Sequence, residues 1–212
     1  LLVPVLLYHH VSDAGKTRYF VPVAQFKAQM KLLADEGYQS ISISQLAGAL
    51  RDGSDLPEKP VVLTFDDGYE DIYENAFPIL SQYHFTGVAY IITGTLGTKL
   101  SYGYMQAPEL KELAAAGWEI GSHSISHTDL KTSKLGMGTE LRQSREDLEA
   151  LLGVPVHSFS YPFGSATAWV QGQVKNYGYD SAVGLGITVT HTRQQLYYLS
   201  RREVYHSLTL KD

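Results

Sequence analysis

The order of apolar and polar residues along the chain alternates between two periods. Short apolar runs rich in β-forming residues predict buried strands at residues 3–8, 61–65 and 88–92. Between such runs, apolar residues recur at spacings of three and four, and the clearest example predicts a helix over residues 139–152. Alternation of strands with helices is typical of βαβ units on a parallel sheet.

The same two patterns continue through the rest of the chain. Further strands are predicted at residues 40–42, 118–121, 156–161, 181–185 and 197–204. Further helices are predicted around residues 26–36, at 44–50 with Ser44 as the cap, at 71–83 with an interruption at Pro78, at 107–116 and at 169–177. About seven or eight such units favour a (β/α) barrel over an open sheet, and 212 residues fit a single domain over 1–212.

Composition narrows the classes of protein. Hydrophobic residues make up 44% and charged residues 18%, as in a soluble globular protein. A formal net charge of −5 argues against a nucleic-acid partner, and the lack of cysteine excludes disulfides and thiolate metal sites. The longest apolar run, residues 1–7, is too short to cross a bilayer, so no transmembrane segment is expected. The chain begins with Leu and shows no signal peptide, which we interpret as a trimmed or mature form.

Two adjacent carboxylates follow the strand predicted at residues 61–65. Asp66 and Asp67 precede Gly68, and like charges side by side raise one pKa unless a cation lies between them. A bound metal ion would remove that conflict. The alternative is a solvated strand end with an Asp-Gly turn.

Two histidines follow the strand predicted at residues 118–121. His123 and His127 are four residues apart, a spacing that puts both on one side of a helical turn. Together with one carboxylate they would make a three-ligand set with open positions for water and substrate. Taken alone, such a pair is more typical of two surface or core histidines in a serine-rich loop. The histidine pair supplies two nitrogen ligands and the carboxylate pair supplies an oxygen ligand, so the two motifs together favour a metal site.

Other candidate groups also follow predicted strands. His9 and His10 end the first strand, and we expect one of the two to be structural. Pro162-Phe163-Gly164 is a turn that can aim a backbone N–H into a cleft, where it would stabilise an oxyanion. An ordinary turn is the alternative.

Three motifs in this order resemble a known family. T-F-D-D-G at residues 64–68, H-S-I-S-H at 123–127 and Y-P-F-G at 161–164 resemble the NodB-homology polysaccharide deacetylases, carbohydrate esterase family 4. The resemblance runs over about residues 3–204. It implies a distorted (β/α)7 barrel and one divalent metal, usually zinc, with cobalt, nickel or iron as alternatives. By motif match, Asp67, His123 and His127 would be the metal ligands, Asp66 the catalytic base, and Phe163 the donor of an oxyanion-binding N–H.

The chain departs from the family pattern in three places. The usual D-x-x-D-W motif is reduced to Asp180-Ser181-Ala182-Val183. The Arg that normally precedes Pro-aromatic-Gly is replaced by Ser160-Tyr161, and no late Leu-x-His motif supplies the general acid. The opening L-L-Y-H-H-V instead resembles the branch that de-N-acetylates poly-β-1,6-N-acetylglucosamine, in which His9 would be the acid. The segment 199–201 also resembles that branch, and Arg201 would replace the missing Arg as partner of the base.

The resemblance predicts an enzyme that releases acetate from an N-acetylated polysaccharide outside the cytoplasm. Peptidoglycan, chitin oligomers and xylan are alternative substrates, and an inactive glycan-binding module on the same fold is an alternative function. A glycoside hydrolase is less favoured, because neighbouring carboxylates such as Asp66 and Asp67 point apart and do not flank one glycosidic bond. Tyr102, Tyr104 and Trp169 are candidates for stacking on sugars, or are packing residues. The sequence does not indicate an oligomeric state.

Overall fold

Eight strands form one parallel sheet at the centre of the molecule. A computed structural model describes residues 1–99, 102–132 and 136–207, so residues 208–212 of the expected domain lie outside the described part. The strands are β1 (Val5–Tyr8), β4 (Gln39–Ser40), β5 (Pro60–Phe65), β6 (Val88–Ile91), β7 (Glu119–Ser122), β8 (Ser158–Ser160), β9 (Ser181–Val183) and β10 (Arg202–Glu203). Their order is β10-β1-β5-β6-β7-β8-β9, with β4 added beside β5.

The sheet curls until its two edges meet. β1 pairs with both β5 and β10, which places the last strand beside the first. At the other edge, Leu199 bridges to Val183 of β9, and the N–H of Gly186 donates to the carbonyl of Arg201 at 3.0 Å. Residues 199–203 therefore join β9 to β1. The result is the distorted (β/α)7 barrel that the sequence predicts, with its irregular part at this junction.

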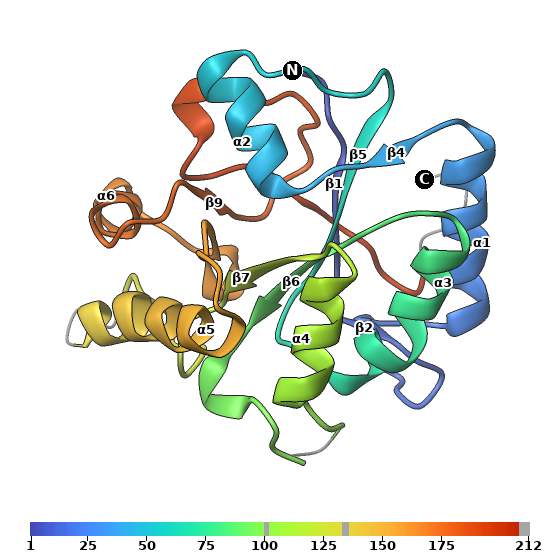
Figure 1. The fold of residues 1–212 in the computed structure, drawn as a ribbon, viewed down its shortest axis with the longest axis horizontal. Coiled ribbons are helices and arrows are strands. Elements are labelled where there is room, and N and C mark those ends of the chain that lie inside the picture. The colour runs from blue at the N-terminus through green and yellow to red at the C-terminus, as the bar shows by residue number, and fades with distance from the viewer. Residues whose placement is uncertain (100–101, 133–135, 208–212) are drawn as a thin grey trace.

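Helices surround the sheet on its outer side (Figure 1). They are α1 (Val23–Asp35), α2 (Ile43–Asp52), α3 (Phe77–Gln82), α4 (Ala107–Ala115), α5 (Ser144–Leu152) and α6 (Ala168–Asn176). Their inner faces bury apolar residues such as Phe26 and Met30 against the strands. The π-helical turns η1 (Ile72–Ala76) and η3 (Thr139–Gln143) lead into α3 and α5. Pro78 lies in the first turn of α3, where a residue without an N–H is tolerated, so the expected interruption is a change of helix type.

Two element boundaries differ from the expectation. The cap of α2 is Ser42 rather than Ser44, because Ser42 Oγ accepts from the N–H of Gln45 at 3.0 Å and the Gln45 side chain accepts from the N–H of Ser42 at 2.8 Å. The strand expected at 197–204 is shorter. The N–H of Tyr198 donates to the carbonyl of Gln195 in a turn, which leaves only the later residues for pairing.

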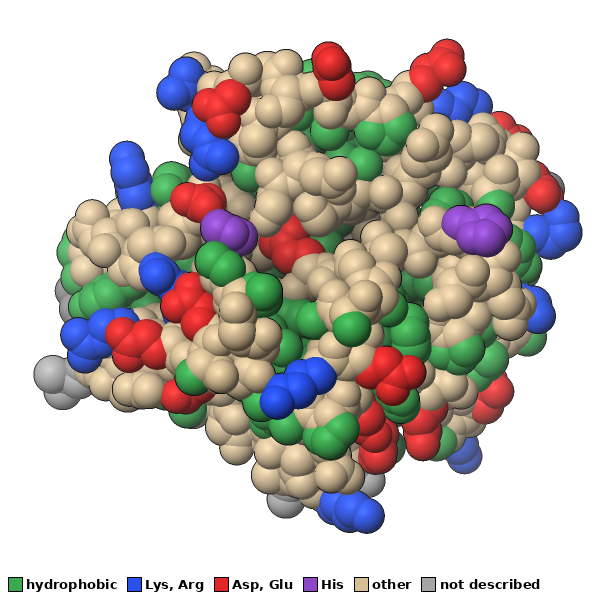
Figure 2. Space-filling model, in the orientation of Figure 1, with side chains coloured by type: hydrophobic (Ala, Val, Ile, Leu, Met, Phe, Trp, Pro, Cys, Tyr) green, Lys and Arg blue, Asp and Glu red, His purple; other side chains and the backbone are tan. Residues whose placement is uncertain are grey.

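The surface carries charges of both signs. Figure 2 shows Lys and Arg interspersed with Asp and Glu around one face, without a field of a single sign. Within the described residues, none of the helices combines the length and apolar character needed to cross a bilayer.

Candidate metal centre and active site

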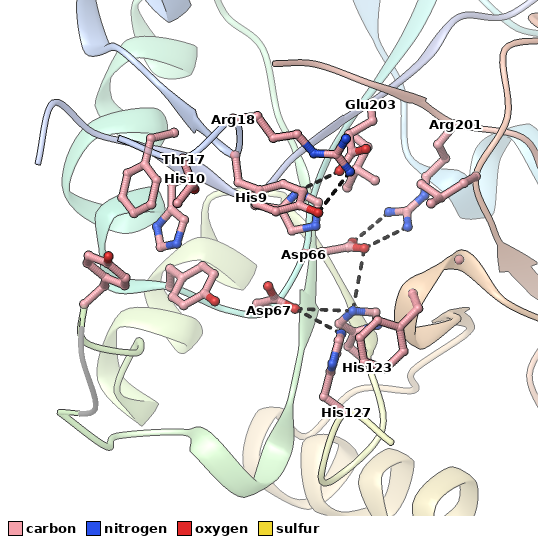
Figure 3. Close-up of a pocket in the computed structure, with 18 residues that line it drawn as sticks. His9, His10, Thr17, Arg18, Asp66, Asp67, His123, His127, Arg201 and Glu203 are labelled. Carbon is pink, nitrogen blue, oxygen red and sulfur yellow. Dashed lines mark hydrogen bonds and ion pairs between the residues drawn. The ribbon is translucent and has the colours of Figure 1, made fainter. Parts of the chain in front are cut away.

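All seven site residues predicted from the sequence line one cavity of about 450 Å³. They come from five segments that are far apart in the chain (Figure 3). His9 follows β1, Asp66 and Asp67 follow β5, His123 and His127 follow β7, Phe163 lies in the turn η4 (Pro162–Gly164) after β8, and Arg201 precedes β10. Except for Arg201, each lies beyond the carboxyl end of its strand. This is the end at which barrels of this type carry their sites.

Asp67, His123 and His127 form a compact ligand set. Asp67 Oδ1 lies 3.4 Å from His123 Nε2 and 3.6 Å from His127 Nε2. Each residue offers one ligand atom, and these three atoms all lie within 4.8 Å of one another. Among the described residues, no other group of three or more His, Asp or Glu side chains has such metal-binding geometry. One carboxylate and two imidazoles are a donor set that zinc accepts.

The protonation of His123 favours a cation at this point. His123 Nδ1 lies 2.8 Å from the carbonyl oxygen of Ser160, which only accepts hydrogen bonds, so Nδ1 carries the proton. The lone pair of Nε2 then faces Asp67 Oδ1, a buried oxygen that accepts no hydrogen bond from the described residues. Two acceptors facing each other are stabilised by a positive charge between them. A ligating histidine whose other nitrogen donates to a backbone carbonyl is the usual arrangement around zinc.

The electrostatics of the site agree with this interpretation. Burial lowers the pKa of the His123 imidazole, but the charge of Asp66 and the contact with Asp67 outweigh it and raise that pKa above its ordinary value. Burial lowers the pKa of His127. The two carboxylates therefore favour positive charge at the position between the histidines, which is where a divalent ion would be stabilised.

The two histidines do not lie on a helical turn, as their spacing suggested. Residues 123–127 form a loop in which Ser124 and His127 have φ values of +66° and +56°. Ser124 Oγ accepts from the N–H of His127 at 3.0 Å and holds this conformation. The loop brings the ligand atoms together by a different route from the one the spacing indicated.

Asp66 is held by a buried arginine. Arg201 makes two parallel hydrogen bonds of 2.7 Å to the two oxygens of Asp66, and Ser160 Oγ donates to Oδ2 at 3.0 Å. Arg201 is 1% exposed. Burial raises the pKa of Asp66, but the guanidinium charge prevails and keeps that pKa well below its ordinary range. Asp66 is therefore ionised and fixed in orientation, as a proton acceptor must be.

His9 and His10 lie in different environments, and His10 is the structural one. His10 Nδ1 lies 2.7 Å from Asp71 Oδ2, and its ring is stacked between Phe20 and Tyr69 at centroid distances of 3.9 and 3.7 Å. His9 lies on the side of the cavity nearer Asp66 (Figure 3).

Sequence reasoning missed a carboxylate beside His9. His9 Nδ1 lies 3.6 Å from Glu203 Oε1, and Glu203 lines the same cavity. Burial lowers the pKa of His9, while Asp67, Asp66 and Glu203 oppose that change. One signal for Glu203 is present in the sequence. It stands two residues after Arg201, so both side chains face the same way on an extended segment.

The residues predicted to bind the oxyanion or a sugar do not all line the cavity. Phe163 has a φ of +59°, and its ring is 63% exposed and 4.6 Å from the His127 ring. The role of its N–H stays a prediction. Tyr102 lines the cavity, whereas Tyr104 stacks on Tyr69 and Trp169 lies on α6 outside the cavity lining.

Comparisons with known sequences agree with the site. The profile of the polysaccharide deacetylase family matches residues 53–182. YxkH of Bacillus subtilis (strain 168), named as a candidate polysaccharide deacetylase, is 30% identical over 203 residues, which cover 95% of this chain and 71% of that protein. The poly-β-1,6-N-acetyl-D-glucosamine N-deacetylase of Escherichia coli (strain K12) is 27% identical over 216 residues, with 82% of this chain and 32% of that protein covered.

A solved structure gives the same result at the level of the fold. The Streptococcus pyogenes deacetylase PplD, in complex with acetate, is 26% identical and has a TM-score of 0.88, with 99% of this chain and 95% of that chain covered. The matched family profile contains the Asp66-Asp67 and His123–His127 motifs. The chain therefore belongs to the polysaccharide deacetylase family, whose members are hydrolases that remove acetyl groups from polysaccharides.

Proposed function

We propose that the protein removes N-acetyl groups from a polymer of N-acetylglucosamine with one divalent metal ion, zinc first among the candidates. One observation carries the metal dependence. Asp67 Oδ1 is buried, accepts no hydrogen bond from the part of the chain that the structure describes, and faces the Nε2 atoms of His123 and His127 at 3.4 and 3.6 Å. Asp67, His123 and His127 would hold the ion. When bound, such an ion acts as a Lewis acid on the acetamide carbonyl and lowers the pKa of water from 15.7 toward about 7.

The proton transfers fall to this chain's own side chains. Asp66 accepts a proton from the attacking water, and Arg201 keeps the Asp66 carboxylate ionised and oriented. Water adds to the carbonyl carbon, and the C–N bond then breaks. His9 donates a proton to the departing amine, and Glu203 beside it favours the protonated imidazole. The products are acetate and a glucosamine unit.

Phe163 has a supporting role in the proposed reaction. Its backbone is held in a left-handed conformation at the wall of the cavity, and its N–H would donate to the oxyanion that forms on the acetyl carbonyl. Such a donor typically contributes about 3 kcal/mol to the stability of the transition state.

The proposed polymer is poly-β-1,6-N-acetylglucosamine, and two facts support it. A relative with 27% identity is named for that substrate, and the Tyr-His-His motif after the first strand, which contains the proposed acid His9, resembles the same branch. This polymer lies outside the cytoplasm, so we place the protein in a secreted or cell-surface location. The chain spans 32% of the E. coli relative, so the activity of that whole protein is not transferred with it.

The test is acetate release from a panel of acetylated glycans by zinc-loaded protein. β-1,6-linked N-acetylglucosamine oligomers are compared with chitin oligomers, peptidoglycan and acetylated xylan, and new reducing ends are measured in parallel. We expect acetate from the β-1,6 oligomers at the highest kcat/KM and no new reducing ends. A preference for another glycan would overturn the substrate assignment. Reducing ends without acetate would indicate a glycoside hydrolase, and zinc binding without any acetate release a glycan-binding module.

A further inference from the structure

A third acidic residue contacts the loop that carries both histidine ligands. Glu140 lies in the π-helical turn η3, immediately before α5, and is not among the residues that line the cavity. Its Oε2 accepts from the N–H groups of Ile125 and Ser126 at 2.9 and 3.0 Å. Its Oε1 accepts from Ser126 Oγ at 2.7 Å. One carboxylate thus accepts three hydrogen bonds from residues that lie between His123 and His127.

The loop needs such an external support. Ser124 and His127 have φ values of +66° and +56°, a region that is unfavourable for residues other than glycine. A strained loop keeps one conformation only when its surroundings define it. The two N–H groups that Glu140 accepts belong to the residues between these two positions.

The opposite side of the loop is held by backbone atoms. The N–H groups of Thr93 and Gly94 donate to the carbonyls of Ser124 and Ile125 at 3.1 and 3.0 Å. Gly94 allows this approach, because a Cβ there would lie 2.5 Å from the carbonyl oxygen of Ile125. The loop is therefore clamped between the segment after β6 and Glu140.

Glu140 is itself fixed by the end of the neighbouring strand. Ser144 Oγ lies 2.6 Å from the carbonyl oxygen of Glu140 and 2.7 Å from Ser122 Oγ at the end of β7. Ser122 Oγ also accepts from the N–H of Ser124 at 3.2 Å. A chain of hydrogen bonds thus connects η3 to the strand that precedes His123. The five-residue π-turn shifts the helix register at this point, a feature frequent near functional sites.

We infer that Glu140 is a positioning residue for the metal centre, which fixes the 123–127 loop so that His123 and His127 present their Nε2 atoms to one ion. This role rests on the proposed metal dependence. Residues that orient ligands from outside the ligand set typically contribute about 10–100-fold to metal affinity. Without Glu140 the loop becomes ordered only when the ion binds. The free energy needed for this ordering weakens zinc binding and speeds zinc release.

The test measures zinc itself, by competition with a chromophoric chelator and by the rate of zinc release to that chelator. E140A should weaken zinc binding by about 10–100-fold and accelerate release. E140Q should lie between E140A and the wild type, because an amide oxygen still accepts from the backbone N–H groups. The matched control is E146Q in the following helix α5, where Glu146 is exposed and forms an ion pair with Arg142 at 4.0 Å. This control should bind zinc as the wild type does.

The unfolding temperature of the metal-free variants separates positioning from general stability. A residue that only stabilises the fold lowers this temperature without changing zinc affinity, and that result for E140A would overturn the inference. If E140A does not fold, E140Q decides in the same way. Wild-type protein that binds no zinc, or binds it equally well after Asp67→Ala, would overturn the proposed metal centre as well. Normal wild-type binding with unchanged Glu140 variants would overturn only the role of Glu140.

Discussion

At the scale of single residues, neighbouring side chains of the same type have different roles because their partners differ. Asp66 faces Arg201 and is paired through both oxygens, whereas Asp67 Oδ1 has no donor and faces two imidazoles. Asp67 itself has a φ of +73°, outside the extended conformation of the strand, and both carboxylates line the same cavity. These different partners fit the proposed roles of Asp66 as proton acceptor and Asp67 as metal ligand.

Replacement of Asp66 by Asn tests this separation. Asn keeps the volume but cannot accept a proton, so kcat should fall by about 10²–10⁴-fold while zinc affinity is retained. Both quantities are measured on the same preparation, with Asp67→Asn as the matched variant that should lose zinc. Loss of zinc from the Asp66 variant would mean that the two roles are exchanged.

The two histidines after β1 offer a second comparison. His9→Ala should lower kcat by about 10²–10⁴-fold, because the departing amine loses its proton donor. His10→Ala removes a ring stacked between Phe20 and Tyr69 and should mainly lower the unfolding temperature. Steady-state rates on the glycan and thermal unfolding of both variants distinguish these effects. A larger loss of kcat in the His10 variant than in the His9 variant would contradict the assignment.

At the scale of elements, the end of the chain completes the site. Residues 199–203 join β9 to β1 and carry both Arg201 and Glu203 into the cavity. Arg201 replaces an arginine that the family pattern places elsewhere, and the ring closure brings its guanidinium to Asp66. The barrel and its catalytic residues therefore depend on the same short segment.

Arg201→Met should destabilise the fold strongly. It leaves the buried Asp66 carboxylate without its cation, and removal of one partner of a buried pair costs about 3–5 kcal/mol. The free energy of unfolding in urea measures the effect. The double variant Arg201→Met with Asp66→Asn should recover part of the loss, because no buried charge remains unpaired. Equal loss in the single and double variants would contradict the coupling.

The contact between His191 and Val3 predicts that the stability of the fold depends on pH. His191 is buried, its Nε2 donates to the carbonyl of Val3 at 3.1 Å, and its Nδ1 has no partner among the described residues. Burial lowers the pKa of His191 below 6.5, although the Val3 carbonyl opposes this. The folded state thus favours the neutral imidazole, and the stability that it contributes is present above about pH 6.5 and is lost as the pH falls through the lowered pKa.

Thermal unfolding between pH 7.5 and 5 tests this contribution. His191→Gln keeps a donor for Val3 but does not titrate. The fall in unfolding temperature on acidification should therefore be smaller in the variant than in the wild type. An equal fall in unfolding temperature in the variant and the wild type would show that His191 does not contribute to the acid sensitivity. Protonation of the metal ligands would then explain that sensitivity alone.

The sequence predicted the regular elements well and the loops poorly. Buried apolar runs gave β5 and β6, and caps gave the ends of α1 and α4, because both depend on local chemistry. The expected helical turn at His123 and His127 was wrong, since that loop is shaped by Glu140 and by backbone groups after β6. Glu203 and Glu140 were missed for the same reason. No local pattern marks the contact of Glu140 with Ile125 and Ser126, and only its place two residues after Arg201 points to Glu203.

At the scale of the whole molecule, the fold brings five distant segments to one end of the curled sheet. The barrel is shared with the S. pyogenes deacetylase over 99% of this chain. Tyr19 and Tyr102 line the cavity beside the catalytic residues and offer aromatic surface to a sugar ring. An acidic chain with both charge signs on its surface suits a neutral glycan better than a polyanion.

The central claim is a single catalytic metal ion held by Asp67, His123 and His127. The most direct measurement is acetate release from a β-1,6-linked N-acetylglucosamine oligomer, after removal of metal with a chelator and stepwise addition of zinc. We expect no release from the metal-free protein, recovery that saturates at one zinc ion per chain, and no recovery in Asp67→Ala. Full acetate release from metal-free protein, or equal recovery in the Asp67 variant, would contradict the claim.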